Sequence, residues 1–281
     1  MKKRNLLLAG LLSVLVSCGG EPADTRPQLV VGLECNYAPF NWTQPHKTSR
    51  SYIISGTKSY ADGYDVQIAK KIADELDMKL VIKKTDWDAL IPSVQTGLID
   101  LIIAGMSPTE SRKIDIDFTN PYYTSEHVLL VKANNPFASV TSVSQLEGAK
   151  IAGQIGTLYD DIAHAIPGVV SYGDAQTVPE IVTKLQLDLI DGTVLELPVA
   201  QGLVALDNTL KIIRFEQGQG FTHLIDEDTN EPREIVDTDR DVSIGLAKGR
   251  DELKNSINTI LDSISSEQRN QIMMEAVDNQ I

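Results

Sequence analysis

Residues 79–105 read KLVIKKTDWDALIPSVQTGLIDLIIAG and contain three patterns in succession. KLVIKK and LIDLIIAG are short apolar runs typical of buried strands. The intervening DWDALIPSVQTG, residues 86–97, predicts a short helix that ends at Gly97. Because a strand, a helix and a second strand in this order form a crossover between parallel strands, the stretch predicts an α/β fold.

The residues upstream continue this pattern. LVVGLE, residues 29–34, predicts another buried strand, and DGYDVQIAKKIADELDM, residues 62–78, predicts an amphipathic helix whose first turn is capped by Asp65. Between them, a loop marked by Pro39 leads into an irregular polar stretch over residues 43–63.

Downstream, a second series of strands and helices predicts a second α/β unit. PYYTSEHVLLVKA, residues 121–133, is a long β-rich run that no helix interrupts, and we expect it to join the two units. From residue 149 to 215, four apolar runs alternate with three helical patterns. Residues 216–241 are acidic and poorly periodic, which predicts a surface insertion, and a strand and two helices end the chain.

The N-terminus has the pattern of an export signal. MKKRN is basic, LLLAGLLSVLV is apolar, and LVSC at residues 15–18 resembles a bacterial lipobox. A lipobox implies cleavage before Cys18, whose diacylglyceryl and palmitate chains would anchor the protein to the cell membrane on its extracytoplasmic side. Residues 19–27 then form a tether. The alternative is an ordinary secretory signal with an incidental cysteine.

Composition excludes several classes of partner and site. The 281 residues carry a net charge of −14 with no basic cluster after the first few residues, so we expect no nucleic-acid partner. If Cys18 is lipidated, Cys35 is the remaining thiol and no intramolecular disulfide can form. The histidines are scattered without ligand spacing, which predicts no metal site: His46, His127, His164 and His223.

Neither a calcium loop nor a catalytic site is expected. DEDTNE, residues 226–231, lacks the glycine that a calcium loop needs for its sharp turn. The chain contains no nucleophile elbow, no phosphate-binding glycine loop and no His-Glu-x-x-His pattern. We therefore expect no catalytic residues, no cofactor and no enzymatic activity.

Polar and aromatic residues follow several predicted strands. Because ligands of open parallel sheets bind beyond the carboxyl ends of strands, we expect these segments to converge: ECNYAPF (34–40), TDWD (85–88), GMSPTESR (105–112), IGT (155–157) and LE (195–196). Together they offer a planar cation, hydroxyl and N–H donors, a carboxylate and two aromatic faces. That set complements a zwitterion with an apolar stem, such as a free amino acid.

Each of these residues also has a structural explanation. Tyr37 and Trp87 could be core aromatics, and Ser107 could cap a helix with Glu110 completing a capping box. Arg112 could lie on a helix surface, and Glu196 could be an acid in the first turn of a helix.

The ordered segments resemble the extracytoplasmic solute-binding proteins of amino-acid ABC transporters, family 3. The resemblance runs from about residue 28 to 275 and is carried by VGLECNYAPFNW, GYDVQIAKKIADEL, DWDALIPSVQTGLIDLIIAGMSPTESRKIDIDFTNPYY, LEGAKIAGQIGT, IDGTVLELPVA and SIGLAKGRDELKNSIN. It implies an α/β, two-lobe periplasmic-binding-protein-like fold of type II. Only the loop near residues 43–62 and the acidic insertion depart from the usual length.

The resemblance also implies a domain division and partners. Lobe 1 would comprise residues 28–122 and 244–281, and lobe 2 residues 127–240, with crossing segments near 122–127 and 238–244. The lobes would close around an amino acid, and the closed monomer would dock on ABC permease subunits. A dehydratase-like enzyme or a sensor on the same fold are the alternatives.

Residue roles follow from the same resemblance. Arg112 would hold the ligand α-carboxylate, helped by Ser107, Thr157 and the backbone N–H of Gly105. Glu196 would bind the α-ammonium, with a methylene more than the commoner aspartate. Tyr37 and Trp87 would sandwich the side-chain stem.

Glu34 determines the expected substrate. It lies where relatives that bind basic amino acids carry an acid facing the distal cation of the ligand. Because a buried carboxylate is costly unless it is paired, Glu34 favours lysine, arginine or histidine. The alternative is a Glu34 that turns outward or bonds to the backbone, with glutamine or another polar amino acid as ligand.

Overall fold

The computed structural model describes residues 24–280. The signal segment 1–18, the lipidation at Cys18 and residues 19–23 of the expected tether lie outside these described residues. Within residues 24–280, none of the helices combines the length and the apolarity needed to cross a bilayer.

The first unit is built on a five-stranded mixed sheet of order β6-β1-β7-β16-β8. Its strands are β1 (Gln28–Leu33), β6 (Lys79–Lys84), β7 (Leu101–Ile102), β8 (Asp117–Thr124) and β16 (Asp241–Leu246). β1 pairs in parallel with β6 and β7, whereas β16 pairs antiparallel with β7 and β8. Residues 79–105 form the predicted strand, helix and strand, with β6 and β7 flanking β1.

The first unit also contains helical segments, several of which contact this sheet. They are α1 (Tyr64–Glu75), η1 (Trp87–Ala89), α2 (Leu90–Gln95), α3 (Glu110–Asp115), α7 (Asp251–Asp262) and α8 (Ser266–Asn279). α1 contacts β6, α2 contacts β1 and β7, and α7 contacts β8. On α1, the residues that recur at helical spacing are all buried: Val66, Ala69, Ile72 and Ala73. The apolar residues seen in the sequence pattern therefore form the packed face of the helix.

The second unit has its own five-stranded mixed sheet, of order β11-β10-β12-β9-β13. The elements are β9 (His127–Lys132), η2 (Val143–Leu146), β10 (Lys150–Ala152), α4 (Leu158–His164), β11 (Val170–Ser171), α5 (Val178–Gln186), β12 (Gly192–Glu196), α6 (Leu197–Leu206) and β13 (Leu210–Ile213). Val194 of β12 packs with α4, while the next residue, Leu195, packs with α5 and α6. Since successive strand residues face opposite sides, helices cover both faces.

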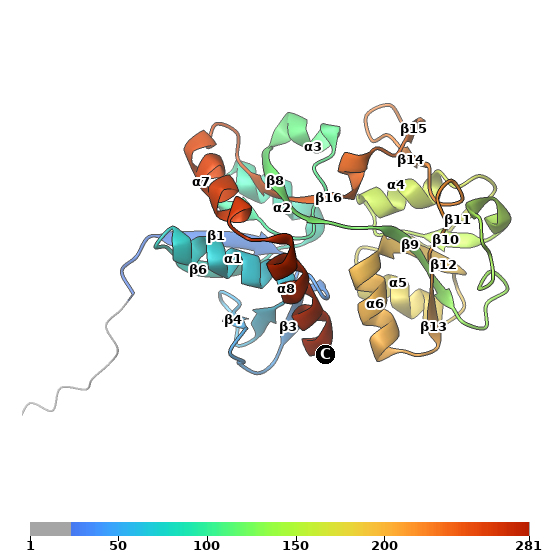
Figure 1. Cartoon of the computed structure of the whole chain (residues 1–281), viewed down its shortest axis with the longest axis horizontal. Coiled ribbons are helices and arrows are strands. Elements are labelled where there is room, and N and C mark those ends of the chain that lie inside the picture. The colour runs from blue at the N-terminus through green and yellow to red at the C-terminus, as the bar shows by residue number, and fades with distance from the viewer. Residues whose placement is uncertain (1–23, 281) are drawn as a thin grey trace, which may run out of the picture.

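Two connections run between the sheets, and Figure 1 shows the units side by side with these segments crossing between them. β8 runs to Thr124, past the boundary expected at residue 122, and β9 begins at His127. On the return, η3 (Asp237–Arg240) leads directly into β16 at Asp241, before the boundary expected at residue 244. The structure confirms the predicted α/β class with two mixed sheets.

The prediction of an irregular stretch over residues 43–63 is wrong. β2 (Asn36–Tyr37), β3 (Asn41–Gln44), β4 (Tyr52–Ile53) and β5 (Tyr60–Asp62) form a small sheet of order β2-β3-β5-β4. The strands hold because Trp42, Ile54 and Ala61 are buried in the core of the first unit. These three buried residues are spread over twenty positions, so the stretch produced no periodic signal.

The acidic insertion also contains regular structure. β14 (His223–Ile225) and β15 (Pro232–Glu234) pair as an antiparallel hairpin, and β14 packs against α4. Leu224 is buried in the core of the second unit, whereas most of the acidic residues around it are exposed. The expected surface insertion therefore contains a hairpin whose Leu224 is buried, with Phe221 and Ile235 packed beside it against the same core.

Candidate functional site

A cavity lies between the two units at the carboxyl ends of β1, β6, β7 and β10. It holds about 400 Å³ of space not filled by atoms, part of it open to solvent. Seven of the eight predicted binding residues line it: Glu34, Tyr37, Trp87, Gly105, Ser107, Arg112 and Thr157. The structure adds Gln154, Leu158, Tyr159, Val178 and Leu195.

Arg112 is held rigidly between the units. Its Nη1 donates to the carbonyl of Ser107 at 2.9 Å, and its Nη2 donates to the carbonyl of Gly156 in the second unit at 3.1 Å. The guanidinium lies 5.2 Å from the centroid of the Trp87 ring. Burial lowers the pKa of Arg112, so the cation carries a desolvation cost that a bound carboxylate would offset.

The cap of the helix that carries Arg112 differs from the prediction. Thr109, not Ser107, precedes α3, and its Oγ1 accepts the N–H of Arg112 at 3.4 Å. The predicted capping box of Ser107 and Glu110 is therefore wrong by two residues. Because Thr109 takes the capping role, the Ser107 side chain is left to face the cavity.

Trp87 and Arg112 meet the second unit at the same atom. The indole Nε1 of Trp87 donates to the carbonyl of Gly156 at 2.8 Å. Gly156 has φ of +71°, a backbone conformation that favours glycine. One backbone carbonyl thus accepts hydrogen bonds from two side chains of the other unit.

Glu34 is buried, with 4 % of its surface exposed, and faces the cavity. Its Oε1 accepts a hydrogen bond from Nε2 of Gln154, in the second unit, at 3.1 Å. Burial raises the pKa of Glu34 to about 7, although the Gln154 hydrogen bond acts in the opposite direction. The alternative of an outward-turned or backbone-bonded Glu34 is therefore wrong.

Gly105 lines the cavity, but its N–H is already engaged. It donates to the hydroxyl oxygen of Tyr122 at 3.1 Å, and that hydroxyl donates to Asp65 at 2.6 Å. This N–H is therefore not free for the predicted contact with a ligand carboxylate, and another donor has to make that contact. Asp65 is not a helix cap as predicted, since α1 begins after Gly63 and the Asp65 side chain lies inside the core.

Tyr37 explains why position 105 is a glycine. A Cβ at Gly105 would lie 2.9 Å from the Tyr37 ring, so a larger residue would displace that ring from the cavity wall. Tyr37 also stacks on Phe40 with 5.6 Å between ring centroids. The aromatic side of the cavity is thereby fixed by packing within the first unit.

Glu196 ends β12 but is not among the lining residues; its neighbour Leu195 is. Its side chain is fully buried, and neither carboxylate oxygen has a hydrogen-bond partner within residues 24–280. Burial raises the pKa of Glu196 well above its usual value. A buried acid without a partner is costly, and such a group needs a cation or a proton.

The lining residues missed by the sequence analysis belong to two kinds. Gln154 closes the predicted strand AKIAGQ, and its position at a strand end was a usable signal. Tyr159 and Val178 lie in the first turns of α4 and α5, where their apolar character matched an ordinary helix face. Only the packing of the units brings these two to the cavity.

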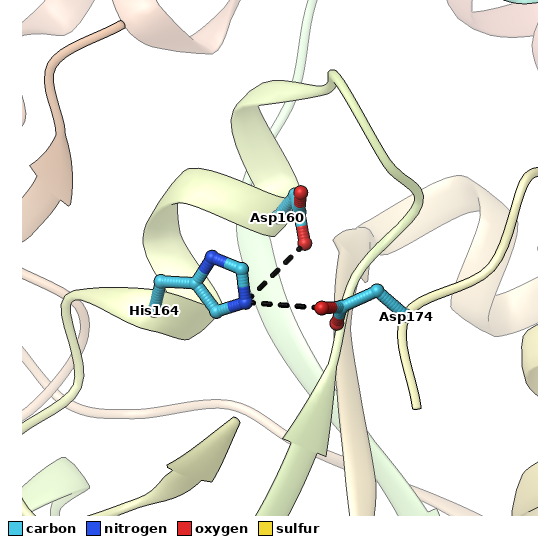
Figure 2. Close-up of side chains that lie close together, drawn as sticks. All are labelled: Asp160, His164 and Asp174. Atoms are coloured by element: carbon cyan, nitrogen blue, oxygen red, sulfur yellow. Dashed lines mark hydrogen bonds and ion pairs between the residues drawn. The ribbon is translucent and has the colours of Figure 1, made fainter. Parts of the chain in front are cut away.

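A second group of ionisable side chains lies outside the cavity, on the second unit (Figure 2). Nε2 of His164 is 3.1 Å from Oδ2 of Asp174 and 3.7 Å from Oδ1 of Asp160. The sequence analysis found no ligand spacing around the histidines. Asp160 and His164 are nevertheless four residues apart on α4, which places them on one helix face.

Comparisons with known proteins agree with this architecture. A family model described as bacterial extracellular solute-binding proteins, family 3, matches residues 29–276. A probable histidine-binding protein of Campylobacter jejuni is 32 % identical over 238 residues, which cover 83 % of this chain and 82 % of that protein.

Solved structures show the same arrangement. An amino acid ABC transporter substrate-binding protein, AbpA, from Streptococcus pneumoniae bound to L-arginine matches with a TM-score of 0.71 and 25 % identity, covering 89 % of this chain and 94 % of that one. An ancestral arginine-binding protein bound to glutamine gives a TM-score of 0.70 and 27 % identity, with coverage of 89 % and 97 %. These matches confirm the two-lobe fold of type II expected from the sequence.

Proposed function

The chain belongs to the bacterial extracellular solute-binding proteins of family 3, and on that premise we propose that it binds a free basic amino acid between its two units. The observation that carries the proposal is the cavity wall itself. It presents a buried arginine, Arg112, and a buried acid, Glu34. Each of these side chains forms a hydrogen bond with the second unit.

Charge balance favours a basic ligand. Arg112 contributes +1, and ionised Glu34 and Glu196 contribute −2, so these buried groups sum to −1. Free arginine or lysine carries two positive charges and one negative charge, which sum to +1 and cancel this deficit. A neutral amino acid leaves the deficit in place, so one of the two acids would have to remain protonated.

Each group has a role in the proposed complex. Arg112 binds the α-carboxylate, with Ser107 and Thr157 as additional donors. Glu196 pairs with the α-ammonium, which would give its buried carboxylate the partner it lacks among the described residues. Tyr37 and Trp87 pack on the side-chain stem, and Glu34 accepts the distal cation.

Glutamine is the second candidate, because Glu34 already accepts a hydrogen bond from the amide of Gln154. A protonated Glu34 could donate to the amide of a ligand in the same way. The relatives support both candidates: one is a probable histidine-binding protein, one was solved bound to L-arginine, and an ancestral arginine-binding protein was solved bound to glutamine.

The cellular setting of the proposal is import. The protein would be held at the outer face of the cell membrane by lipid on Cys18 and would deliver its ligand, as a monomer, to ABC permease subunits. Mass spectrometry of the mature N-terminus tests the anchor, since cleavage before Cys18 and two ester-linked acyl chains are expected. An unmodified Cys18, or cleavage elsewhere, would contradict it.

Isothermal titration calorimetry with the twenty amino acids tests the ligand, on protein unfolded and refolded to remove bound solute. We expect saturable binding of arginine, lysine or histidine with one site per chain. Binding of glutamine without any of these three would overturn the role of Glu34. Binding of none of the twenty would overturn the proposed function.

A further inference from the structure

The inference concerns Asp160, His164 and Asp174, which turn toward one point beside α4 (Figure 2). We propose that these three side chains bind a divalent transition-metal ion, with Zn²⁺ as the chemically best matched. The site belongs to the second unit and is separate from the amino-acid cavity, since none of the three residues lines that cavity.

The ligand atoms are close to the separations that a metal ion requires. One oxygen of Asp160, one oxygen of Asp174 and a ring nitrogen of His164 all lie within 4.8 Å of one another. The nitrogen is 3.1 Å and 3.7 Å from the two oxygens. Two ligands bound about 2.1 Å from a tetrahedral Zn²⁺ lie about 3.4 Å apart, so small side-chain rotations suffice.

Helix α4 and the segment after β11 present these atoms. Asp160 and His164 are one turn apart on α4, so their side chains emerge from the same helix face. Asp174 follows β11, and its Oδ1 accepts the N–H of Gly153 at 3.1 Å. That hydrogen bond orients the carboxylate and leaves Oδ2 directed at His164, as expected of a supported metal ligand.

Asp160 supplies a second, independent observation. Its Oδ1 is buried and has no hydrogen-bond partner within residues 24–280, although the side chain points into the cluster. A buried carboxylate oxygen without a donor is unfavourable unless a cation or a water completes it. A metal ion at the centre of the cluster would satisfy this oxygen and would offset the repulsion between the two aspartates.

The donor set selects the class of ion. One imidazole nitrogen and two carboxylate oxygens suit Zn²⁺ and neighbouring first-row ions, whereas Ca²⁺ and Mg²⁺ prefer sites made of oxygen alone. Three protein ligands leave at least one position for water. His164 would bind as the neutral imidazole through Nε2.

The position of the site links it to the amino-acid cavity. The N–H of Ile155 donates to the carbonyl of Ala175 at 2.9 Å, so the chain that carries Asp174 also holds the loop at residues 153–157. Gln154 and Gly156 of that loop form the hydrogen bonds to the first unit. A bound ion would therefore stiffen this loop. The importance of that stiffening for the cavity rests on the proposed function, whereas metal binding itself does not rest on it.

Titration of the complete protein with ZnCl₂ alone tests the site, using protein without a histidine tag. We expect one Zn²⁺ per chain by calorimetry, and a visible absorption band when Co²⁺ is used as a spectroscopic substitute. His164→Ala and Asp160→Asn should each weaken Zn²⁺ binding by at least about tenfold. His223→Ala, which removes an exposed histidine outside the cluster, should leave the affinity unchanged.

The outcomes separate this proposal from the proposed function because no amino acid is present in the titration. Absence of stoichiometric Zn²⁺ binding, or unchanged binding in both cluster variants, would overturn the site and leave only an ion pair between His164 and the two aspartates. If a variant does not fold, NMR of the unsubstituted protein decides. Zn²⁺ must shift the imidazole signals of His164, and unshifted signals would contradict the proposal.

Discussion

The two walls of the cavity are built in different ways. The wall of the first unit takes its side chains from three separate strand ends, after β1, β6 and β7: Glu34, Tyr37, Trp87, Ser107 and Arg112. The wall of the second unit is formed mainly by the single loop after β10, with the first turns of α4 and α5 beside it. The first wall carries the charged groups and the rings of Tyr37 and Trp87, while the second presents backbone, uncharged side chains and the ring of Tyr159.

This difference suggests separate tasks. Tyr37 stacks on Phe40 and Arg112 donates to Ser107 within the first unit, so we infer that this wall recognises the ligand. The second wall reaches the first through three hydrogen bonds, from Trp87 and Arg112 to Gly156 and from Gln154 to Glu34. Such bonds contribute about 1 kcal/mol each. Glu227 of the second unit adds a hydrogen bond from Ser111 and an ion pair with Arg112. We infer that the second wall serves closure.

The largest effect is expected from Arg112→Ala, which removes the only cation of the recognising wall among its described lining residues. Loss of a buried, charge-assisted carboxylate partner costs about 2–5 kcal/mol, so affinity for every amino-acid ligand should fall by more than about thirtyfold. Calorimetry measures the loss. Arg250→Ala is the control, because Arg250 is half exposed and is not among the residues that line the cavity.

If Arg112→Ala binds as tightly as the unsubstituted protein, recognition does not reside in the first wall. Binding that falls equally in Arg250→Ala would point instead to a general effect of net charge.

The next largest effect is expected from Glu196→Gln, which asks whether the second unit contributes a charge as well as closure. Affinity should fall by about tenfold or more, because an amide cannot form an ion pair with the α-ammonium. Because Glu196 is buried without a partner among the described residues, losing its charge removes no contact in the empty protein, so thermal unfolding without ligand should barely change. Unchanged affinity would mean that the charge of Glu196 does not contribute to binding and that the charged groups that bind the ligand belong to the first wall.

The pH dependence of arginine binding tests Glu34, whose pKa in the empty protein is about 7 because the group is buried. Below pH 7 the empty protein holds a proton on Glu34, and that proton must leave before the carboxylate can pair with the guanidinium of the ligand. Affinity should therefore fall by up to about tenfold for each pH unit below this pKa and level off above it.

Glu34→Gln should remove the part of this pH dependence that comes from Glu34 and weaken arginine binding at pH 8. Glu110→Gln, at an exposed acid on α3, is the matched control and should retain the profile of the unsubstituted protein. A pH-independent affinity in the unsubstituted protein would show that Glu34 does not face the distal cation.

The smallest effect is expected from Trp87→Phe, which keeps an aromatic face but removes the indole hydrogen bond to Gly156. Losing one cross-unit hydrogen bond should weaken binding by about 1 kcal/mol, appearing as faster dissociation in stopped-flow measurements. Trp42→Phe is the matched control, since the buried Trp42 Nε1 has no partner within residues 24–280. An equal change in both variants would argue against a closing role for Trp87.

The extent of sequence-based prediction differs between backbone and side chains. The strand, helix and strand of residues 79–105 and the helical face of α1 were predictable because apolar periodicity reports which side of an element is buried. Helix starts were less predictable: Gly63 and Thr109 precede α1 and α3, where Asp65 and Ser107 were expected to cap. The Asp65 side chain accepts hydrogen bonds from Asn41 and Tyr122 instead, and Ser107 lines the cavity. A local capping pattern contains no information about either arrangement.

The sequence by itself determined the α/β class, the family and the positions of most cavity-lining residues, because strand ends and family motifs are local patterns. Only the tertiary structure decided that Glu34 meets Gln154, 120 residues away, that Tyr122 takes the N–H of Gly105, and that Glu196 is enclosed without a partner among the described residues. It also brought Asp174 to Asp160 and His164. Contacts between distant segments depend on how two sheets and their helices pack, and that packing is a property of the whole chain.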